Sequence, residues 1–392
     1  MHPLSGPDVA DKSVCFVVGA RPNFMKVAPV YHALSATDPG LRLLLVHTGQ
    51  HYDADMSAVF IDELGLPMPD VFLGVGSGSH AQQTADALVG IERVLVEALP
   101  SLVVVAGDVN STLAGALAAA KLDIPVAHVE AGLRSFDETM PEETNRRLTD
   151  HVSSLLLAHS ANAVENLERE GIDPRRIHLV GNTMIDSVFR HLPSALSREP
   201  WRRLGVEPGE FALLTLHRPA LVDDDVVLRV AVDELRRLAR TTPLVFPVHP
   251  RTRRRLELSG VDLGGLHSDR VVVTEPLGYL EFLGLEARAA FVVTDSGGVQ
   301  EETSALGVRC FTLRESTERP VTVDLGTNTI LGARPERLRQ IPKLLRVERP
   351  VHAIPYWDGE AGVRAAAIFN DYVGVERPLG GPMARAAGSG SS

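Results

Sequence analysis

Short runs of apolar residues alternate with longer segments in which apolar residues recur at helical spacing, over most of this chain of 392 residues. Apolar runs of this kind are typical of strands that are buried on both faces of a parallel sheet. The segments between the runs predict helices that cover the two faces. The repeated alternation of strand and helix therefore predicts doubly wound parallel sheets and the α/β fold class.

The pattern divides the chain into two halves. In the first half it predicts strands at 13–19, 43–46, 101–106, 125–129, 153–159 and 177–180, with helices at 53–64, 82–99 and 112–121. In the second half it predicts strands at 211–216, 244–248, 270–273, 289–293 and 310–313, with helices at 224–241, 278–286, 299–306 and from Glu336 onward. The polar, proline-containing stretch 192–200 separates the two halves.

We therefore expect two Rossmann-like domains that face each other across a cleft. The first domain spans residues 1–190 and the second spans residues 191–376, followed by a disordered tail at 377–392. The last predicted helix, 362–372, is a candidate to pack back on the first domain. Ligands in such sheets bind beyond the carboxyl ends of the strands, and polar motifs follow the predicted strands in both halves.

A Ser-Gly-Gly turn, Ser296 to Gly298, joins the predicted strand 289–293 to a helix. Its glycines let the backbone approach a ligand closely, and the free N–H groups of the first helical turn favour an anion. Glu302 lies one turn into that helix, where a carboxylate could accept both hydroxyls of a ribose. For an isolated motif, a tight turn with a capping serine would be the simpler interpretation.

A second turn of the same kind lies near the N-terminus and strengthens the interpretation as an anion site. It runs from Gly19 to Lys26, and Pro22 suits the first position of a helix. Arg21 and Lys26 therefore flank a predicted helix N-terminus.

Composition excludes several classes of function. The net charge of -11 and the pI near 5.7 argue against binding to nucleic acid or to an anionic membrane. No apolar run approaches the roughly 20 residues of a membrane span, and the N-terminus lacks the regions of a signal peptide. We therefore expect a cytoplasmic protein. Cys15 and Cys310 lie in apolar runs and are expected to be buried thiols.

The sequence lacks the common cofactor and metal signatures. Neither half carries the Gly-x-Gly-x-x-Gly dinucleotide fingerprint, a P-loop or the spaced His and Cys ligands of a zinc site, so we expect no cofactor and no metal. Acidic residues and one histidine stand at or near the predicted strand ends instead. Carboxylates at such positions often cap helices or pair with arginines, and Arg134, Arg146 and Arg147 are close in sequence. Residue type alone favours at most one or two catalytic members of the set Asp108, Glu130, Glu142, Glu143 and His217.

Taken together, the motifs closely resemble those of the non-hydrolysing UDP-N-acetylglucosamine 2-epimerases. They occur in the family's order over nearly the whole chain, and the combination is far more specific than any single motif. The matching segments are Gly19 to Lys26, Thr48 to His51, Gly107-Asp108, His128 to Arg134, Pro141 to Arg146, Gly181-Asn182, Leu216 to Pro219, Asp295 to Glu302 and Thr317 to Pro320.

The resemblance implies a fold of the glycosyltransferase-B type, a homodimer, and a UDP-sugar held mainly by the second domain. It implies that Ser296, Gly297, Gly298 and Arg21 contact the diphosphate, that Glu302 contacts the ribose and that Phe282 lies near the uracil. The remaining residues expected to bind the substrate are Lys26, Arg218 and Arg319. The catalytic residues carried over from the family are Asp108, Glu130, Glu142 and His217.

The implied reaction is the reversible inversion of C2 between UDP-N-acetylglucosamine and UDP-N-acetylmannosamine. The C2 hydrogen is not acidified by an adjacent carbonyl, so members of the family eliminate UDP to give 2-acetamidoglucal and then add it back. A base and an acid with adjusted pKa values are needed at C2. Cationic groups and a helix N-terminus must stabilise the departing diphosphate. Which carboxylate transfers which proton is left open.

Two positions depart from the family pattern. Ala220 follows the His-Arg-Pro segment where relatives usually have Glu, and Asp53 stands where some bacterial members have a second Gln. Both positions belong to regions that line the sugar or a second, activating UDP-sugar. In this chain Gln50, His51 and Asp53 would form that second site.

Three other functions remain open. The same residues could serve a hydrolysing epimerase that releases free N-acetylmannosamine, or a UDP-sugar-dependent transferase of the same fold. A third possibility is an inactive UDP-sugar sensor, although all four carried-over catalytic residues are retained.

Overall fold

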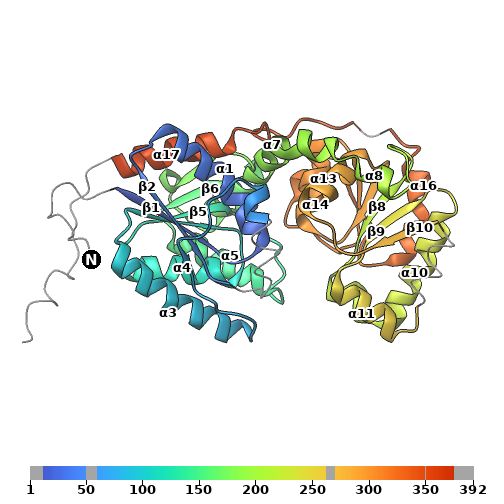
Figure 1. Cartoon of the computed structure of the whole chain (residues 1–392), viewed down its shortest axis with the longest axis horizontal. Helices are drawn as coiled ribbons and strands as arrows, with labels where there is room; N and C mark the ends of the chain where they lie inside the picture. The colour runs from blue at the N-terminus through green and yellow to red at the C-terminus, as the bar shows by residue number, and fades with distance from the viewer. Residues whose placement is uncertain (1–11, 50–59, 262–269, 349, 375–392) are drawn as a thin grey trace, which may run out of the picture.

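The computed structural model describes residues 12–49, 60–261, 270–348 and 350–374. The chain forms two lobes, each built on one parallel sheet (Figure 1). The strands of the first sheet are β1 (Ser13–Val18), β2 (Arg42–His47), β3 (Val71–Phe72), β4 (Leu102–Ala106), β5 (Val126–Ala131), β6 (Leu155–Ala158) and β7 (Ile177–Leu179). The strands of the second sheet are β8 (Ala212–Thr215), β9 (Leu244–Pro247), β10 (Val271–Thr274), β11 (Phe291–Thr294), β12 (Arg309–Thr312) and β13 (Asn328–Ile330).

The two sheets share one topology. Their strand orders are β3-β2-β1-β4-β5-β6-β7 and β10-β9-β8-β11-β12-β13. Both orders start from a central strand, move to one edge and then return to the other, as in doubly wound dinucleotide-binding folds. The predicted α/β class with two doubly wound sheets is therefore confirmed. The short strands β3 and β13 had no predicted counterpart.

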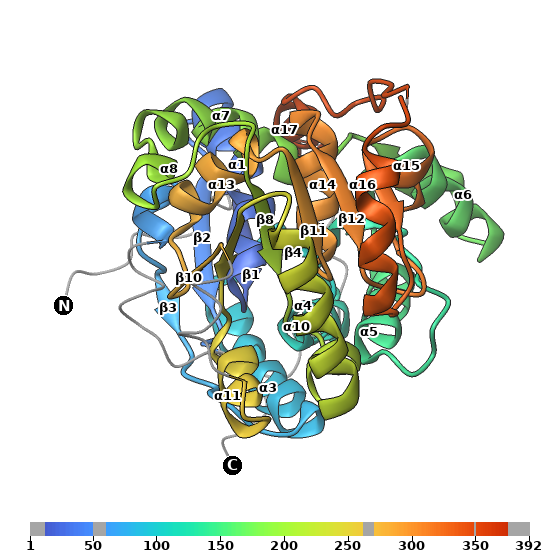
Figure 2. The same ribbon diagram turned by 90° about the vertical axis from the view of Figure 1, so that its right-hand side faces the viewer.

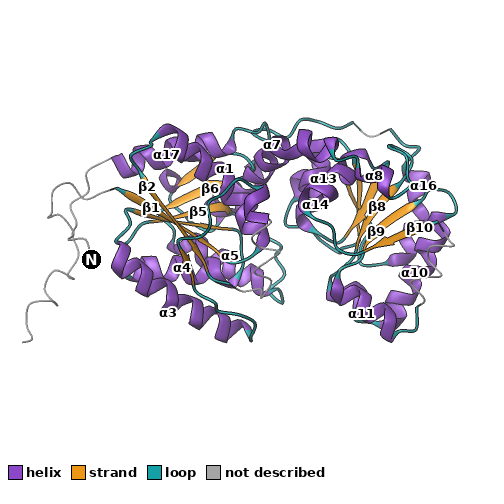
Figure 3. Cartoon of the chain, viewed as in Figure 1, coloured by secondary structure: helices purple, strands orange, loops and turns teal. Residues whose placement is uncertain are grey.

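Helices cover both faces of each sheet (Figure 3). The helices of the first lobe are α1 (Arg21–Thr37), α3 (His80–Ala98), α4 (Asn110–Lys121), α5 (Pro141–Val152), α6 (Ala161–Arg169), the 3-10 helix η1 (Pro174–Arg176) and α7 (Thr183–Ser197). Those that follow are α8 (Pro200–Arg203), α9 (Pro219–Val222), α10 (Asp225–Ala239), α11 (Pro250–Leu258), α13 (Tyr279–Arg288), α14 (Gly297–Leu306), α15 (Pro320–Asp324), the 3-10 helix η2 (Pro335–Gln340), α16 (Ile341–Leu344) and α17 (Ala361–Gly374).

Alternate residues of each central strand enter different cores, which is why the strands are apolar throughout. In β1, Phe16 joins the core formed with α1, α7 and α17, whereas Val17 joins the core formed with α3 and α4. In β8, Leu214 packs toward α10 and Leu213 packs toward α13 and α14. Burial of both faces is the usual property of a parallel sheet between two helical layers.

Helix α17 lies beside α1 of the first lobe in both Figure 1 and Figure 2. A Cβ at Gly362 would lie 2.7 Å from the carbonyl carbon and oxygen of Pro29, so only glycine allows this close approach. The carboxylate of Asp186 accepts the N–H of Ala361 at 3.2 Å and of Gly362 at 2.6 Å, which ties the start of α17 to α7. Helix α7 passes through residue 190, and the domain boundary near that residue stays a prediction.

Within the described ranges, no helix combines the length and the apolar content that crossing a bilayer requires.

Candidate active site

The predicted site residues lie at the carboxyl ends of strands in both sheets, and one arginine joins the two groups. Arg319, at the start of α15 in the second lobe, donates from Nη2 to Glu130 Oε1 of β5 at 3.2 Å. Both side chains are buried. The carboxyl edges of the two sheets therefore face each other, which is the arrangement that a ligand shared by two such domains requires.

Glu130 has an unusual backbone conformation. Its φ is 70°, in the left-handed region, and the β5–β6 register shifts between Val129 and Ala131. A bulge with this geometry changes the direction of one side chain, and a non-glycine residue in this region costs about 1–3 kcal/mol. The carboxylate of Glu130 is thereby placed against the ammonium group of Lys26 as well as Arg319.

The cations around Glu130 keep it ionised. Burial alone would raise its pKa, but the charges of Lys26 and Arg319, the two largest opposing effects, lower the pKa to about 2. Gly107, in the turn after β4, has a φ of 68°, which favours glycine, and a Cβ there would lie 2.7 Å from Lys26 Nζ.

Asp108, the residue after that glycine, is held by an arginine of α5. Arg146 donates from Nη2 to Asp108 Oδ2 at 2.5 Å and also pairs with Glu143. Glu143 in turn accepts from the N–H and Oγ of Ser135 at 2.9 and 2.8 Å. Glu143 is therefore a structural carboxylate that positions Arg146, whereas Asp108 is partly exposed, at 23% of its side chain.

Glu142 precedes Glu143 on α5 and faces the second lobe. It is partly exposed, and its charge acts on the Arg218 guanidinium of the second lobe. Burial, followed by the charge of Arg314, lowers the pKa of Arg218, and the carboxylates nearby partly offset that effect.

His217 is oriented by Asp295. Its backbone N–H and that of Arg218 both donate to Asp295 Oδ2 at 2.7 Å, and His217 Nδ1 lies 2.8 Å from Oδ1. Asp295 is fully buried, whereas 42% of the His217 side chain is exposed. Burial of Asp295 would raise its pKa, but hydrogen bonding and charge from His217 outweigh it and the pKa is lowered.

The Ser-Gly-Gly turn opens α14 directly beside Arg319. A Cβ at Gly297 would lie 2.5 Å from Arg319 Nη1, so a larger residue would displace the guanidinium group from the carboxylates that it pairs with. Arg319 also donates from Nη1 to Glu318 at 2.7 Å, and its Nε lies 2.9 Å from Glu301. The helix N-terminus and a buried guanidinium group therefore lie together at one position.

The structure describes three other residues that the sequence predicts as ligands. Arg21 packs over the Phe60 ring at 4.9 Å, at the start of α1. Phe282 is partly buried in the core between α13 and the second sheet. Glu302 is buried one turn into α14. Gln50, His51 and Asp53 lie outside the described residues.

Four residues of the site had no role in the sequence prediction: His159, Glu301, Glu318 and Asp295. Neither ring nitrogen of His159 has a hydrogen-bond partner among the described residues, and its Nε2 lies 3.5 Å from Glu301 Oε1. Burial, with the charges of Arg319 and Lys26 opposing that of Glu130, lowers the pKa of His159 to about 4. The sequence signal that could have identified His159 is its position directly after β6, at the carboxyl end of the strand.

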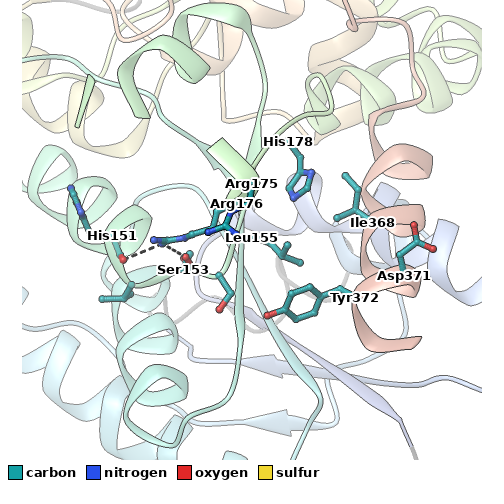
Figure 4. A pocket seen from close by; sticks show the side chains of 11 residues that line it. His151, Ser153, Leu155, Arg175, Arg176, His178, Ile368, Asp371 and Tyr372 are labelled. Atoms are coloured by element: carbon teal, nitrogen blue, oxygen red, sulfur yellow. Dashed lines mark hydrogen bonds between the residues drawn. The ribbon is translucent and has the colours of Figure 1, made fainter. Parts of the chain in front are cut away.

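A separate cavity of about 880 Å³ lies at the amino ends of β6 and β7 (Figure 4). Arg176 in its wall donates to the carbonyls of Asp150 at 3.3 Å and His151 at 3.2 Å. The cavity contains none of the predicted site residues, and sheets of this type bind ligands at the opposite edge. Among the residues described, no three His, Cys, Asp or Glu side chains form a group suited to a metal ion.

Comparison with known proteins gives the family. The sequence profile of UDP-N-acetylglucosamine 2-epimerase matches residues 33–370. A UDP-N-acetylglucosamine 2-epimerase of Methanococcus maripaludis is 42% identical over 369 residues, which is 92% of this chain and 98% of the relative. A UDP-2,3-diacetamido-2,3-dideoxy-D-glucuronate 2-epimerase of Pseudomonas aeruginosa is 43% identical over 321 residues, which is 81% of this chain and 87% of the relative.

A solved structure confirms the fold. The Methanocaldococcus jannaschii UDP-GlcNAc 2-epimerase in complex with UDP-GlcNAc and UDP matches with a TM-score of 0.84 and 41% identity, covering 92% of this chain and 99% of that chain. The expected two-domain arrangement of the glycosyltransferase-B type is therefore confirmed. With its motifs, its fold and these matches in agreement, the chain belongs to the UDP-N-acetylglucosamine 2-epimerase family.

Proposed function

We propose that the protein catalyses the reversible C2 epimerisation of UDP-N-acetylglucosamine to UDP-N-acetylmannosamine without hydrolysis. The observation that carries the proposal is the cluster at the facing carboxyl edges of the two sheets. There the carboxylate of Glu130 lies against Lys26 and Arg319, and the charge of Asp108 acts on the same Arg319. Carboxylates for proton transfer and cations for a leaving diphosphate thus occupy one place.

The chemistry divides into an elimination and its reversal. A carboxylate takes the C2 proton while the bond between C1 and the UDP oxygen breaks, and the electron pair of the C–H bond forms the C1–C2 double bond of 2-acetamidoglucal. An acid then returns a proton to the opposite face of C2, and UDP adds again at C1. Asp108, Glu130, Glu142 and His217 are the residues proposed for these proton transfers.

The proposed ligand contacts follow from the charges of both lobes. Ser296, Gly297 and Gly298 lie at the N-terminus of α14, which favours an anion. With Arg21, Lys26, Arg218 and Arg319 they would hold the diphosphate, while Glu302 would accept the ribose hydroxyls and Phe282 would lie near the uracil.

Diphosphate binding would change the protonation of Glu130. Lys26 and Arg319 lower the pKa of Glu130 despite its burial. A bound diphosphate would compete for the same two cations, so the pKa of Glu130 would rise toward the operating pH, where a carboxyl group transfers protons most effectively. Substrate binding would in this way prepare the residue for catalysis.

The decisive experiment is incubation with UDP-N-acetylglucosamine in heavy water, followed by NMR. We expect deuterium at C2 in both epimers, with the sugar still linked to UDP. Release of free N-acetylmannosamine would show a hydrolysing epimerase instead. UDP release that depends on an added acceptor would show a transferase, and binding without exchange would indicate a sensor.

The sugar itself has a second candidate. The Pseudomonas aeruginosa relative is named for a diacetamido-dideoxy-glucuronate and matches at 43% identity. Ala220, on α9 beside His217 and Arg218, stands where relatives usually have Glu, and loss of a carboxylate removes a repulsive charge for an acidic sugar. Comparison of kcat/KM for the two UDP-sugars decides between them.

The proposal includes a homodimer and a cytoplasmic location. Val89 and Val96 of α3 are 44% and 50% exposed, and Leu148 of α5 is 47% exposed, which supplies apolar surface for a partner copy. Light scattering on the full chain should therefore give twice the monomer mass of 42.3 kDa. A monomer that keeps full activity would contradict the dimer, and fractionation of the native cells tests the location.

A further inference from the structure

Two buried carboxyl groups from adjacent helices face each other beneath the proposed ribose site. Glu286 of α13 is fully buried, and Glu302 of α14 is 5% exposed. The helices pack together, and the two carboxyl groups are close enough that each shifts the pKa of the other. Neither oxygen of Glu286 has a donor elsewhere in the described part of the chain.

No Lys or Arg of the described residues acts on the pKa of either carboxyl group. Tyr279 of the same helix faces both carboxyl groups, and its hydroxyl has no partner among the described residues. Cys310 of β12 is the other titratable group beside Glu286, and His191 of α7 lies against the Tyr279 ring at 6.1 Å. Within the described ranges, the charge that acts on Glu286 is that of Glu302.

Two ionised carboxylates that are close together and buried from water would repel each other strongly, so the pair retains a proton. Burial and the neighbouring Glu302 raise the pKa of Glu286 well above its usual range. Burial also raises the pKa of Glu302, to about 7, although the hydrogen bond from Glu286 opposes this. The pKa of Glu286 is raised more than that of Glu302. Glu286 therefore keeps the proton and Glu302 carries the charge.

We propose that Glu286 is a positioning residue that shares one proton with Glu302 and donates it to that carboxylate while Glu302 binds the uridine ribose. The assignment of the ribose to Glu302 rests on the proposed function. An ionised carboxylate has about four lone-pair sites, enough for two ribose hydroxyls and for Glu286. The third donor fixes the orientation of Glu302, so the ribose meets acceptors that are already in place.

The shared proton links UDP affinity to pH. Bound ribose excludes water and fixes the charge on Glu302, so Glu286 holds its proton more firmly in the complex than in the free protein. Since the pKa is higher in the complex, UDP binding takes up protons and UDP affinity falls as the pH rises through the range in which the free pair ionises.

The test is calorimetry of UDP binding to the full chain from about pH 6 to about pH 9, in buffers of different ionisation enthalpy. Glu286→Gln keeps a donor but cannot ionise, so it should bind UDP at neutral pH and lose both the alkaline decrease in affinity and the proton uptake. Glu286→Met has similar length and no donor, so it should lose about tenfold in UDP affinity at all pH values.

Glu281→Gln is the matched control, because Glu281 lies on the same helix but pairs with Arg203 at the surface. It should behave as the wild type. The titration of UDP itself is the same for all variants. The test therefore compares the pH dependence of UDP affinity and the proton uptake between variants. If Glu286→Gln and Glu286→Met both keep the wild-type affinity and pH profile, the inference is wrong.

An infrared measurement separates this inference from the proposed function. The ligand-free protein at neutral pH should show a protonated carboxyl C=O band that disappears in Glu286→Gln and changes frequency in Glu302→Gln, where Glu286 stays buried and protonated but loses its carboxylate acceptor. If that band is present and UDP does not bind, the pair exists and the proposed function fails. If UDP binds but neither variant changes the infrared spectrum, the proposed function stands and the shared proton is refuted.

Discussion

At the scale of single residues, Glu130 shows how local strain serves the site. A regular strand would direct this side chain along the pleat, but the φ of 70° and the bulge after Val129 turn it toward Lys26 and Arg319. Residues held in this region persist only where the surrounding structure determines them. Two buried ion pairs provide that constraint here.

Replacement of the proposed acid and base groups by their amides should abolish catalysis and leave ligand binding intact. Asp108→Asn and Glu130→Gln keep side-chain shape but cannot transfer protons, so turnover should fall by about 100-fold or more. UDP affinity should be retained, because the cations that would bind the diphosphate remain. C2 exchange in heavy water and calorimetry measure the two quantities.

The control for these amide variants is Glu138→Gln, an exposed residue between β5 and α5 that should leave turnover unchanged. Near-normal C2 exchange in Asp108→Asn or Glu130→Gln would remove that residue from the mechanism.

At the scale of elements, one buried carboxylate holds the end of β5 to the turn after β4. Asp150 of α5 lies 2.6 Å from His128 Nδ1, 2.8 Å from Arg134 and 3.2 Å from the N–H of Gly132. His128 Nε2 in turn lies 2.7 Å from the carbonyl of Gly107. Asp150 thus fixes the backbone on both sides of the proposed catalytic carboxylates.

Asp150→Asn should therefore destabilise the fold by about 1–3 kcal/mol, because it removes the buried charge that accepts from Arg134, which keeps Glu170 as its other partner. Burial alone would raise the pKa of Asp150, but His128 and Arg134 outweigh it and lower the pKa. A lowered folded-state pKa means that the stabilisation is present above about pH 4, the unfolded value, and is lost as the pH falls further.

Urea unfolding at several pH values measures the effect of Asp150→Asn. The difference from wild type should be largest at neutral pH and should shrink in acid. Asp173→Asn is the control, since Asp173 pairs with Arg175 at the surface, and it should change little. Equal stability of Asp150→Asn and wild type at neutral pH would contradict this account.

The start of α14 gives a second prediction for an element. In Gly297→Val the new Cβ would fall 2.5 Å from Arg319 Nη1 and displace it, and the branched side chain would block backbone approach to the diphosphate. UDP binding should be lost while the fold remains. Gly278→Ala is the control, because a Cβ at this glycine, just before α13, would have no neighbour within 4 Å among the described residues.

Circular dichroism and calorimetry test the Gly297 prediction together. A folded Gly297→Val protein with wild-type UDP affinity would refute the assignment of the Ser-Gly-Gly turn to the diphosphate.

At the scale of the whole molecule, the lobes are joined by chain connections and by the Glu130–Arg319 ion pair. Helix α17 returns to α1, and Trp357 just before it donates from Nε1 to the carbonyl of His159 at 2.9 Å. The second lobe is therefore connected to the first at both ends of its sequence. The domain limits at 190 and 376 stay predictions.

Regulation by a second UDP-sugar should be weak or absent in this protein. Asp53 stands where some relatives have a neutral amide, and a carboxylate that faces a diphosphate is repulsive. Each 1.4 kcal/mol of lost interaction lowers effector affinity about tenfold. Ala220 also lacks the carboxylate that relatives usually place there. A reverse reaction started from pure UDP-N-acetylmannosamine should therefore proceed at an immediate linear rate.

A long lag that a trace of UDP-N-acetylglucosamine removes would contradict this expectation. Asp53→Gln supplies the matched comparison, since it restores the neutral amide of some relatives and should increase any activation.

Local pattern was enough to predict the doubly wound sheets, because burial on both faces makes every central strand apolar. It also located the Ser-Gly-Gly turn, although the side chain that a Cβ at Gly297 would meet, Arg319, comes from a later segment. Element ends were less accurate where a side chain decides them. Ser79 accepts the N–H of Gln82, so α3 begins at His80, before the predicted residue 82. The helix predicted from Glu336 is split into η2 and α16.

The sequence by itself determined the fold class, the two turns and the carboxylates at the strand ends, because each depends on neighbouring residues. Only the tertiary structure decided which of these groups meet. The Glu130–Arg319 pair spans 189 positions, and the proximity of Glu286 to Glu302 depends on how two helices pack. A buried charge is stable only beside its partner, and the position of that partner in space is not a property of any local segment.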